Sequence, residues 1–196
     1  MLDSLIPKLH ALVPDMLQLT RRLVEVNSYT QNIAGVNAVG AQLKAAFALP
    51  ALGLREHAAV SCGTHLLWST PASAQRPPLL LIGHHDTVFP PGHFEGYREQ
   101  AERAYGPGAL DMKGGLAIIW GVMKVLSDAG ALAELALCIV SVADEETGSQ
   151  DSKPHLEALA RRATGALVFE AGRKGDAIIT ARRGVGGLRV TAEGTA

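Results

Sequence analysis

Cysteine, net charge and long apolar runs are all scarce in this sequence, and each shortage excludes a class of protein. Cys62 and Cys138 are its only cysteines and lie far apart, so a disulfide framework is excluded and we expect reduced thiols. A net charge of −1 gives no reason to expect nucleic acid or an anionic membrane as a partner. No apolar run approaches the roughly 18 residues of a membrane span, and the N-terminal residues lack a signal-peptide pattern. We therefore expect a cytoplasmic protein that binds neither nucleic acid nor membrane.

The rest of the composition is typical of a globular protein. Apolar residues make up 47% and charged residues 19% of the 196 residues, so the chain can bury a core. Helical patterns are expected up to Val26 with a break at Pro14, then over 35–48, 113–130 and 152–162. Strands are expected over 54–60, 64–70, 79–82, 135–142, 166–169, 177–180 and 187–191. The alternation between residues 79 and 170 predicts an α/β fold with a mostly parallel sheet flanked by helices.

Acidic and imidazole side chains follow three of these apolar strands. They are His84 and Asp86 after residues 79–82, Glu145 and Glu146 after 135–142, and Glu170 after 166–169, with Asp111 in a loop between the first two strands. The carboxyl ends of parallel strands share one edge of a sheet, so these groups are expected to converge. In an extended chain His84 and Asp86 point to the same side, an arrangement in which a carboxylate holds the second nitrogen of a metal-binding His.

Two interpretations of this cluster remain open on the residues alone. The side chains can be ordinary solvated charges at strand ends. Gathering carboxylates is unfavourable, however, because two like charges ~4 Å apart cost about 4 kcal/mol at an effective dielectric constant near 20. A divalent cation removes that cost, and carboxylates with imidazole are typical zinc ligands. A separate metal site at His57, Cys62 and His65 is not expected, because the sequence offers no fourth ligand nearby.

Four ordered motifs carry a resemblance to a known family. GHHDTV, GPGALDMKGG, DEETGS and FEAG resemble, in order and spacing, the zinc-dependent exopeptidases related to glutamate carboxypeptidase. Aminoacylase, acetylornithine deacetylase and succinyl-diaminopimelate desuccinylase belong to the same family. The resemblance implies two Zn²⁺ ions, with Co²⁺ or Mn²⁺ as possible replacements. It implies that Asp111 bridges the ions, that His84 and Glu170 complete one ion's ligands, and that Glu146 binds the other.

The resemblance also implies how the reaction proceeds. Glu145 would be the general base that takes a proton from a water held between the ions and passes it to the leaving amine. Asp86 would orient His84, and the peptide bond after Asp111 would be cis. The implied function is hydrolysis of a C-terminal peptide bond or of an N-acyl-amino-acid amide, with a small peptide or an N-acyl amino acid as substrate. The alternatives are an N-acyl-amino-acid deacylase of the same family and an inactive, truncated metal-binding chain.

The sequence departs from the family at its C-terminal end. Family members carry a further zinc-ligand His late in the chain and a small inserted domain through which they form homodimers. Residues 1–180 are expected to be the N-terminal part of the catalytic domain, and 181–196 the start of the inserted domain. The chain therefore resembles an N-terminal fragment that lacks one zinc ligand. His93 and His155 are expected at the surface and do not replace that ligand.

Overall fold

A five-stranded sheet forms the centre of the computed structural model, which describes all residues except 1, 176, 185 and 195–196. The strands run β1 (Gly53–His57), β2 (His65–Ser69), β6 (Leu137–Val142), β3 (Leu79–His84) and β7 (Gly165–Val168) across the sheet. β3 pairs in parallel with both β6 and β7, whereas β1, β2 and β6 pair antiparallel. The predicted α/β fold with a sheet flanked by helices is confirmed, but the sheet is mixed and not mostly parallel, since among its described pairings only those of β3 with β6 and with β7 are parallel.

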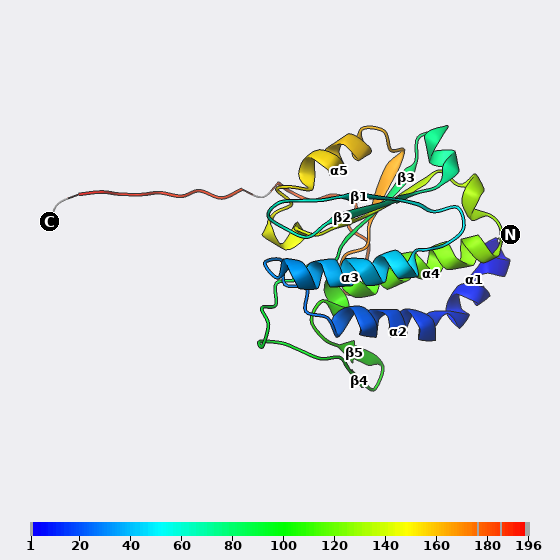
Figure 1. Cartoon of the computed structure of the whole chain (residues 1–196), viewed down its shortest axis with the longest axis horizontal. Coiled ribbons are helices and arrows are strands. Elements are labelled where there is room, and N and C mark those ends of the chain that lie inside the picture. Colours follow the sequence, from blue (N-terminus) through cyan, green and yellow to red (C-terminus); the bar gives the residue numbers. More distant parts are fainter. Residues whose placement is uncertain (1, 176, 185, 195–196) are drawn as a thin grey trace.

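Helices cover both faces of the sheet (Figure 1). α3 (Ile33–Ala46) and α4 (Gly114–Asp128) lie on one face, with α1 (Leu2–Ala11) and α2 (Val13–Val24) outside them, and α5 (Lys153–Ala160) lies on the other. Pro14 stands in the first turn of α2, where its missing N–H costs no helical hydrogen bond. A small hairpin of β4 (Arg98–Gln100) and β5 (Arg103–Tyr105) lies apart from the sheet.

The central strands are buried on both faces, because successive side chains alternate between two cores. Leu81 and Ile139 belong to the larger core beneath α3 and α4, whereas Leu80 and Val140 pack towards α5. This alternation explains why the strands read as unbroken apolar runs. The polar residues come only after these apolar strands, so they lie at the carboxyl edge of the sheet.

Two expected strands are absent from the C-terminal segment. Residues 177–180 and 187–191 form no strand, and the segment extends away from the body (Figure 1). Ile178 and Leu188 are 88% and 91% exposed, so neither stretch has an edge to pair with, and an unpaired strand leaves its backbone hydrogen bonds unmade. The prediction of these strands was wrong. The proposed boundary at residue 180 stays a prediction, and residues 185, 195 and 196 of the second part lie outside the described residues.

Among the described residues, no helix has both the length and the apolar character needed to cross a membrane.

Candidate metal centre

The acidic and imidazole residues that follow β3, β6 and β7 meet at one edge of the sheet. His84 is the last residue of β3, and Glu145 and Glu146 stand in a 3-10 turn, Glu145–Thr147, just after β6. Glu170 follows β7, and Asp111 lies in the irregular turn that leads into α4. The parallel pairing of the three strands therefore produces the convergence that the sequence predicts.

His84 is the centre of this cluster and is almost completely buried. Its Nε2 atom lies 2.9 Å from Oδ1 of Asp111, 3.5 Å from Oε1 of Glu170 and 4.0 Å from Oε2 of Glu145. Potential ligand atoms form two groups within 4.8 Å: His84 with Asp111 and Glu170, and His84 with Glu145 and Glu146. The first group contains the three residues expected at one zinc ion. The second contains Glu146, the residue expected at the other ion, but not Asp111.

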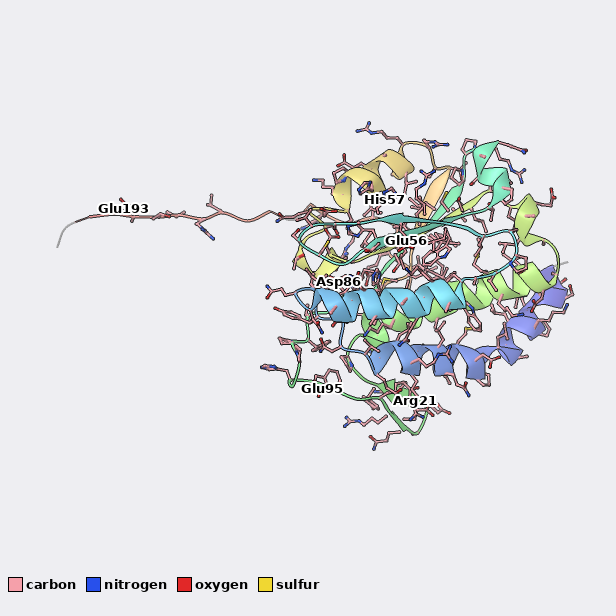
Figure 2. The ribbon with its side chains drawn as sticks, in the orientation of Figure 1. Arg21, Glu56, His57, Asp86, Glu95 and Glu193 are labelled. Carbon is pink, nitrogen blue, oxygen red and sulfur yellow. The ribbon has the colours of Figure 1, made fainter. Side chains whose placement is uncertain are left out.

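Asp86 is fully buried and lies near the N-terminal end of α3 (Figure 2). Its Oδ1 atom is 3.3 Å from Nδ1 of His84, and that nitrogen also lies 3.1 Å from the Asp86 carbonyl oxygen. The backbone N–H groups of Glu145 and Glu146 donate to the same carboxylate, at 3.3 and 3.2 Å. Asp86 therefore orients His84 and holds the turn that carries the two glutamates.

The electrostatics of the centre favour extra positive charge. Burial lowers the pKa of His84, but the hydrogen bond and charge of Asp86, together with nearby glutamates, outweigh burial and raise that pKa to about 9. Burial raises the pKa of Glu146 to about 7, and neighbouring carboxylates act in the same direction. Burial likewise raises the pKa of Glu170. These groups retain protons that a divalent cation can replace, so the residues present fit a metal centre.

Close backbone packing brings Asp111 to Glu170. A Cβ atom on Gly115, in the first turn of α4, would lie 2.1 Å from the carbonyl oxygen of Phe169. Only glycine therefore lets the start of α4 approach the end of β7 this closely. The Asp111–Met112 peptide bond is cis, as the resemblance implied.

Two polar residues near the centre were missed in the sequence. The Thr30 hydroxyl donates to Oδ2 of Asp86 at 2.7 Å, although the sequence around Thr30 indicates only a polar turn. Lys113 is fully buried, its Nζ donates to the Val26 carbonyl oxygen, and burial lowers its pKa to about 7. No local signal in the sequence marks either contact, because each joins segments more than 50 residues apart.

A second cluster, formed by Cys62, His65 and Asp144, also has potential ligand atoms within 4.8 Å of one another. The backbone N–H of Ala143 donates to Nδ1 of His65 at 3.0 Å, so the proton of the neutral ring lies on Nε2. That nitrogen is 3.0 Å from Oδ1 of Asp151 and donates to it. A metal on Nε2 would leave both ring nitrogens without a proton, as an imidazolate. The hydrogen bonds of His65 therefore make this cluster a support for the segment after β6, and Asp144, not His57, joins Cys62 and His65 in it.

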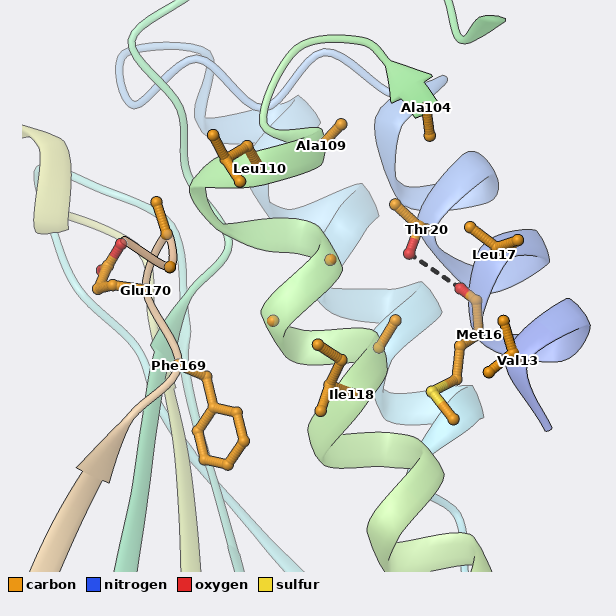
Figure 3. A pocket seen from close by; sticks show the side chains of 15 residues that line it. Val13, Met16, Leu17, Thr20, Ala104, Ala109, Leu110, Ile118, Phe169 and Glu170 are labelled. Carbon is orange, nitrogen blue, oxygen red and sulfur yellow. Dashed lines mark hydrogen bonds between the residues drawn. The ribbon is translucent and has the colours of Figure 1, made fainter. Parts of the chain in front are cut away.

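An apolar hollow of about 410 Å³ borders the centre (Figure 3). Its lining comes mainly from α2, α4 and the segment after β7, including Leu17, Ile118 and Phe169, and it shares Glu170 with the centre. Leu110, which also lines the hollow, is 72% exposed. The centre thus lies beside an open apolar surface.

His93 and His155 are both exposed, as expected. Neither belongs to a possible ligand group among the described residues.

Comparison with known proteins gives a consistent result. Residues 80–186 match the peptidase family M20/M25/M40. Carboxypeptidase G2 from Pseudomonas sp. (strain RS-16) is 30% identical over 169 residues, which cover 83% of this chain and 40% of that enzyme. The chain therefore spans about two fifths of the length of this relative.

Solved structures share the fold. A tripeptidase from Staphylococcus aureus superposes with a TM-score of 0.62 at 22% identity, covering 81% of this chain and 43% of its own. An M20 family metallo-carboxypeptidase from Sulfolobus solfataricus superposes with a TM-score of 0.61 at 18% identity, covering 80% and 37%. At these identities the likeness demonstrates a common architecture.

Proposed function

Because the chain belongs to the peptidase family M20/M25/M40, we propose that it provides the catalytic residues of a zinc-dependent exopeptidase. The reaction is hydrolysis of a C-terminal peptide bond or of the amide bond of an N-acyl amino acid, in the manner of a carboxypeptidase. The observation that carries this proposal is the position of His84, whose Nε2 atom faces carboxylates from three separate segments at the carboxyl edge of the sheet.

Four residues would hold the metal. His84, Asp111 and Glu170 form one possible ligand group, and Glu146, with Asp111 as the bridge, would serve a second ion. Zinc at such a site supplies Lewis acidity, which acidifies water and polarises a carbonyl group. The two carboxylates with raised pKa, Glu146 and Glu170, would lose their protons when the ions bind.

Glu145 would be the general base. Its side chain is 46% exposed and its Oε2 atom is 4.0 Å from Nε2 of His84, so the carboxylate can reach a water molecule at the centre. Its backbone is fixed by Asp86. Glu145 would accept a proton from that water and deliver it to the leaving amine, while Asp86 keeps the Nδ1 proton of His84 and so sets the ring's orientation.

The proposal includes a small peptide or an N-acyl amino acid as substrate. It also includes a cytoplasmic location and a homodimer, which the resemblance implies for the whole protein.

Metal content and hydrolysis test the proposal together. The whole protein, loaded with zinc, is incubated with dipeptides and N-acyl amino acids, and released amino acid is quantified. Glu145→Gln should keep its zinc, because Glu145 is not assigned as a ligand, yet lower kcat by roughly 10²- to 10⁴-fold. Activity near that of the unmodified protein would contradict the assignment of the base. Loss of zinc from this variant would show that Glu145 and Glu146 exchange roles.

A further inference from the structure

The turn that carries Glu145 and Glu146 belongs to a closed loop, residues 144–152. The buried carboxylate of Asp144 closes the loop, because its Oδ2 atom accepts the backbone N–H groups of Asp151 and Ser152 at 2.8 and 3.1 Å. The Asp144 carbonyl oxygen accepts the N–H of Ser149 at 2.9 Å. These hydrogen bonds tie the first residue of the loop to its last residues.

This loop has a further attachment to the sheet besides Asp86. His65, in β2, is 3% exposed. Its Nδ1 accepts the N–H of Ala143, at the start of the loop, and its Nε2 donates to Asp151, near the end of it, both at 3.0 Å. One rigid imidazole ring thus fixes both ends of the loop to a neighbouring strand.

We propose that His65 and Asp151 are positioning residues that set the places of Glu145 and Glu146 relative to His84. The proposal rests on the proposed function. Asp86 accepts the backbone N–H groups of the two glutamates, and the His65–Asp151 hydrogen bond holds the end of the same loop. Neither positioning residue belongs to the two ligand groups around His84.

Breaking the His65–Asp151 hydrogen bond should affect the two ligand groups around His84 differently. The group of His84, Asp111 and Glu170 takes no residue from the loop, so its metal binding should persist when the His65–Asp151 bond is broken. Metal binding through Glu146 should weaken by about 10- to 100-fold, the usual effect of removing a residue that orients a ligand. kcat should fall with it, because Glu145 shifts as well, whereas KM should change little.

Asp151 can be replaced in two ways that differ only in whether the hydrogen bond to His65 is kept. Its side chain is 36% exposed, so Asp151→Ala removes the hydrogen bond without opening a cavity in the core. Asp151→Asn keeps an oxygen that accepts the Nε2 proton of His65 and should restore the behaviour of the unmodified protein. Glu157→Ala, an exposed change on α5, is the control for surface effects.

Amide hydrogen exchange, zinc titration and hydrolysis are measured on all four variants of the whole protein, because residues 1–196 alone are expected to hold zinc poorly through Glu146. Asp151→Ala should speed exchange over residues 144–152 by at least about tenfold, leave exchange in β3 unchanged, and weaken zinc binding or lower kcat, with rescue in Asp151→Asn. Unchanged loop exchange in Asp151→Ala would overturn the proposal, and so would equal damage in Asp151→Asn. A faster loop with unaltered zinc affinity and kcat would also overturn it. Absence of hydrolysis by the unmodified protein would instead count against the proposed function, while the exchange and zinc results would still decide the positioning role.

Discussion

The Asp86 carboxylate lies 3.3 Å from Nδ1 of His84 and at the same time accepts the backbone N–H of Glu146. One buried group thus holds the imidazole of β3 and the turn after β6 in a fixed relation. Burial raises the pKa of Asp86, but hydrogen bonds from His84 and Thr30 outweigh burial and lower it. Asp86 is therefore ionised at neutral pH, as an orienting carboxylate must be.

Asp86→Ala should weaken zinc binding by about 10- to 100-fold, because His84 loses the acceptor that orients its ring. The measurement is a zinc titration against a competing chelator. His85→Gln serves as the neighbouring control, since His85 is directed to Ser141, 2.8 Å from its Nδ1, and faces away from the centre. If the His85 variant lost zinc while Asp86→Ala kept it, the assignment of the two strand faces would be wrong.

Much of this centre could be predicted from local patterns. The apolar run of β3 and the residues after it fix the place of His84 and Asp86 along the chain, and parallel pairing then determines which edge they share. The partner of β2 could not be predicted in this way, because antiparallel pairing with β6 depends on contacts about 70 residues apart. The hydrogen bond from Thr30 to Asp86 is equally remote.

The two wrongly predicted strands show that strand-like composition alone is not sufficient for a strand. Residues 177–180 and 187–191 have strand-like composition, with Ile178 and Val190 among them, yet no neighbouring edge pairs with them in the described part of the chain. Strand propensity expresses how well side chains fit a pleated, half-buried surface. Composition alone therefore does not produce a strand where that surface is missing.

Gly115→Ala should disturb the centre through the backbone. The added methyl group would lie 2.1 Å from the Phe169 carbonyl oxygen, so α4 must move away from the end of β7. We expect about 1–3 kcal/mol of lost unfolding free energy and weaker zinc binding, because Asp111 and Glu170 separate. Gly53→Ala is the control, since its nearest contact would be 3.7 Å. Urea unfolding and zinc titration provide the measurements, and equal behaviour of the two variants would contradict this account.

The contribution of His84 to the stability of the metal-free protein should depend on pH in a defined direction. The pKa of His84 rises from an ordinary value of 6.5 to about 9 in the folded protein, so the folded state binds the proton more tightly than the unfolded state does. The resulting stabilisation is fully present below about pH 6.5 and is lost as pH rises through about 9, with an upper bound of about 3 kcal/mol.

Urea unfolding with a chelator present, between pH 6 and pH 9.5, measures this decline. Zinc should reduce it, because the bound ion takes the place of the Nε2 proton. His84→Asn isolates the contribution of His84, because Lys113, whose pKa burial lowers to about 7, changes the stability in the opposite direction in both proteins. The stability difference between the unmodified protein and His84→Asn should shrink as pH rises from 6.5 to 9, and a difference that grows would show that burial, and not the surrounding carboxylates, dominates at His84.

The number of zinc ions bound by residues 1–196 is the most direct test of the ligand assignment. His84, Asp111 and Glu170 supply three ligands and leave one position open, a set that is sufficient to hold zinc. The second ion would have only Glu146 and the shared Asp111, whose side chain is 54% exposed, and two carboxylates in contact with water hold zinc poorly. We therefore expect equilibrium dialysis to give about one tightly bound zinc ion per chain, with little hydrolysis.

Glu170→Gln should abolish that binding, whereas Glu146→Gln should leave it nearly unchanged. Two tightly bound ions with full turnover would require a further ligand, and His93 would be the first residue to substitute.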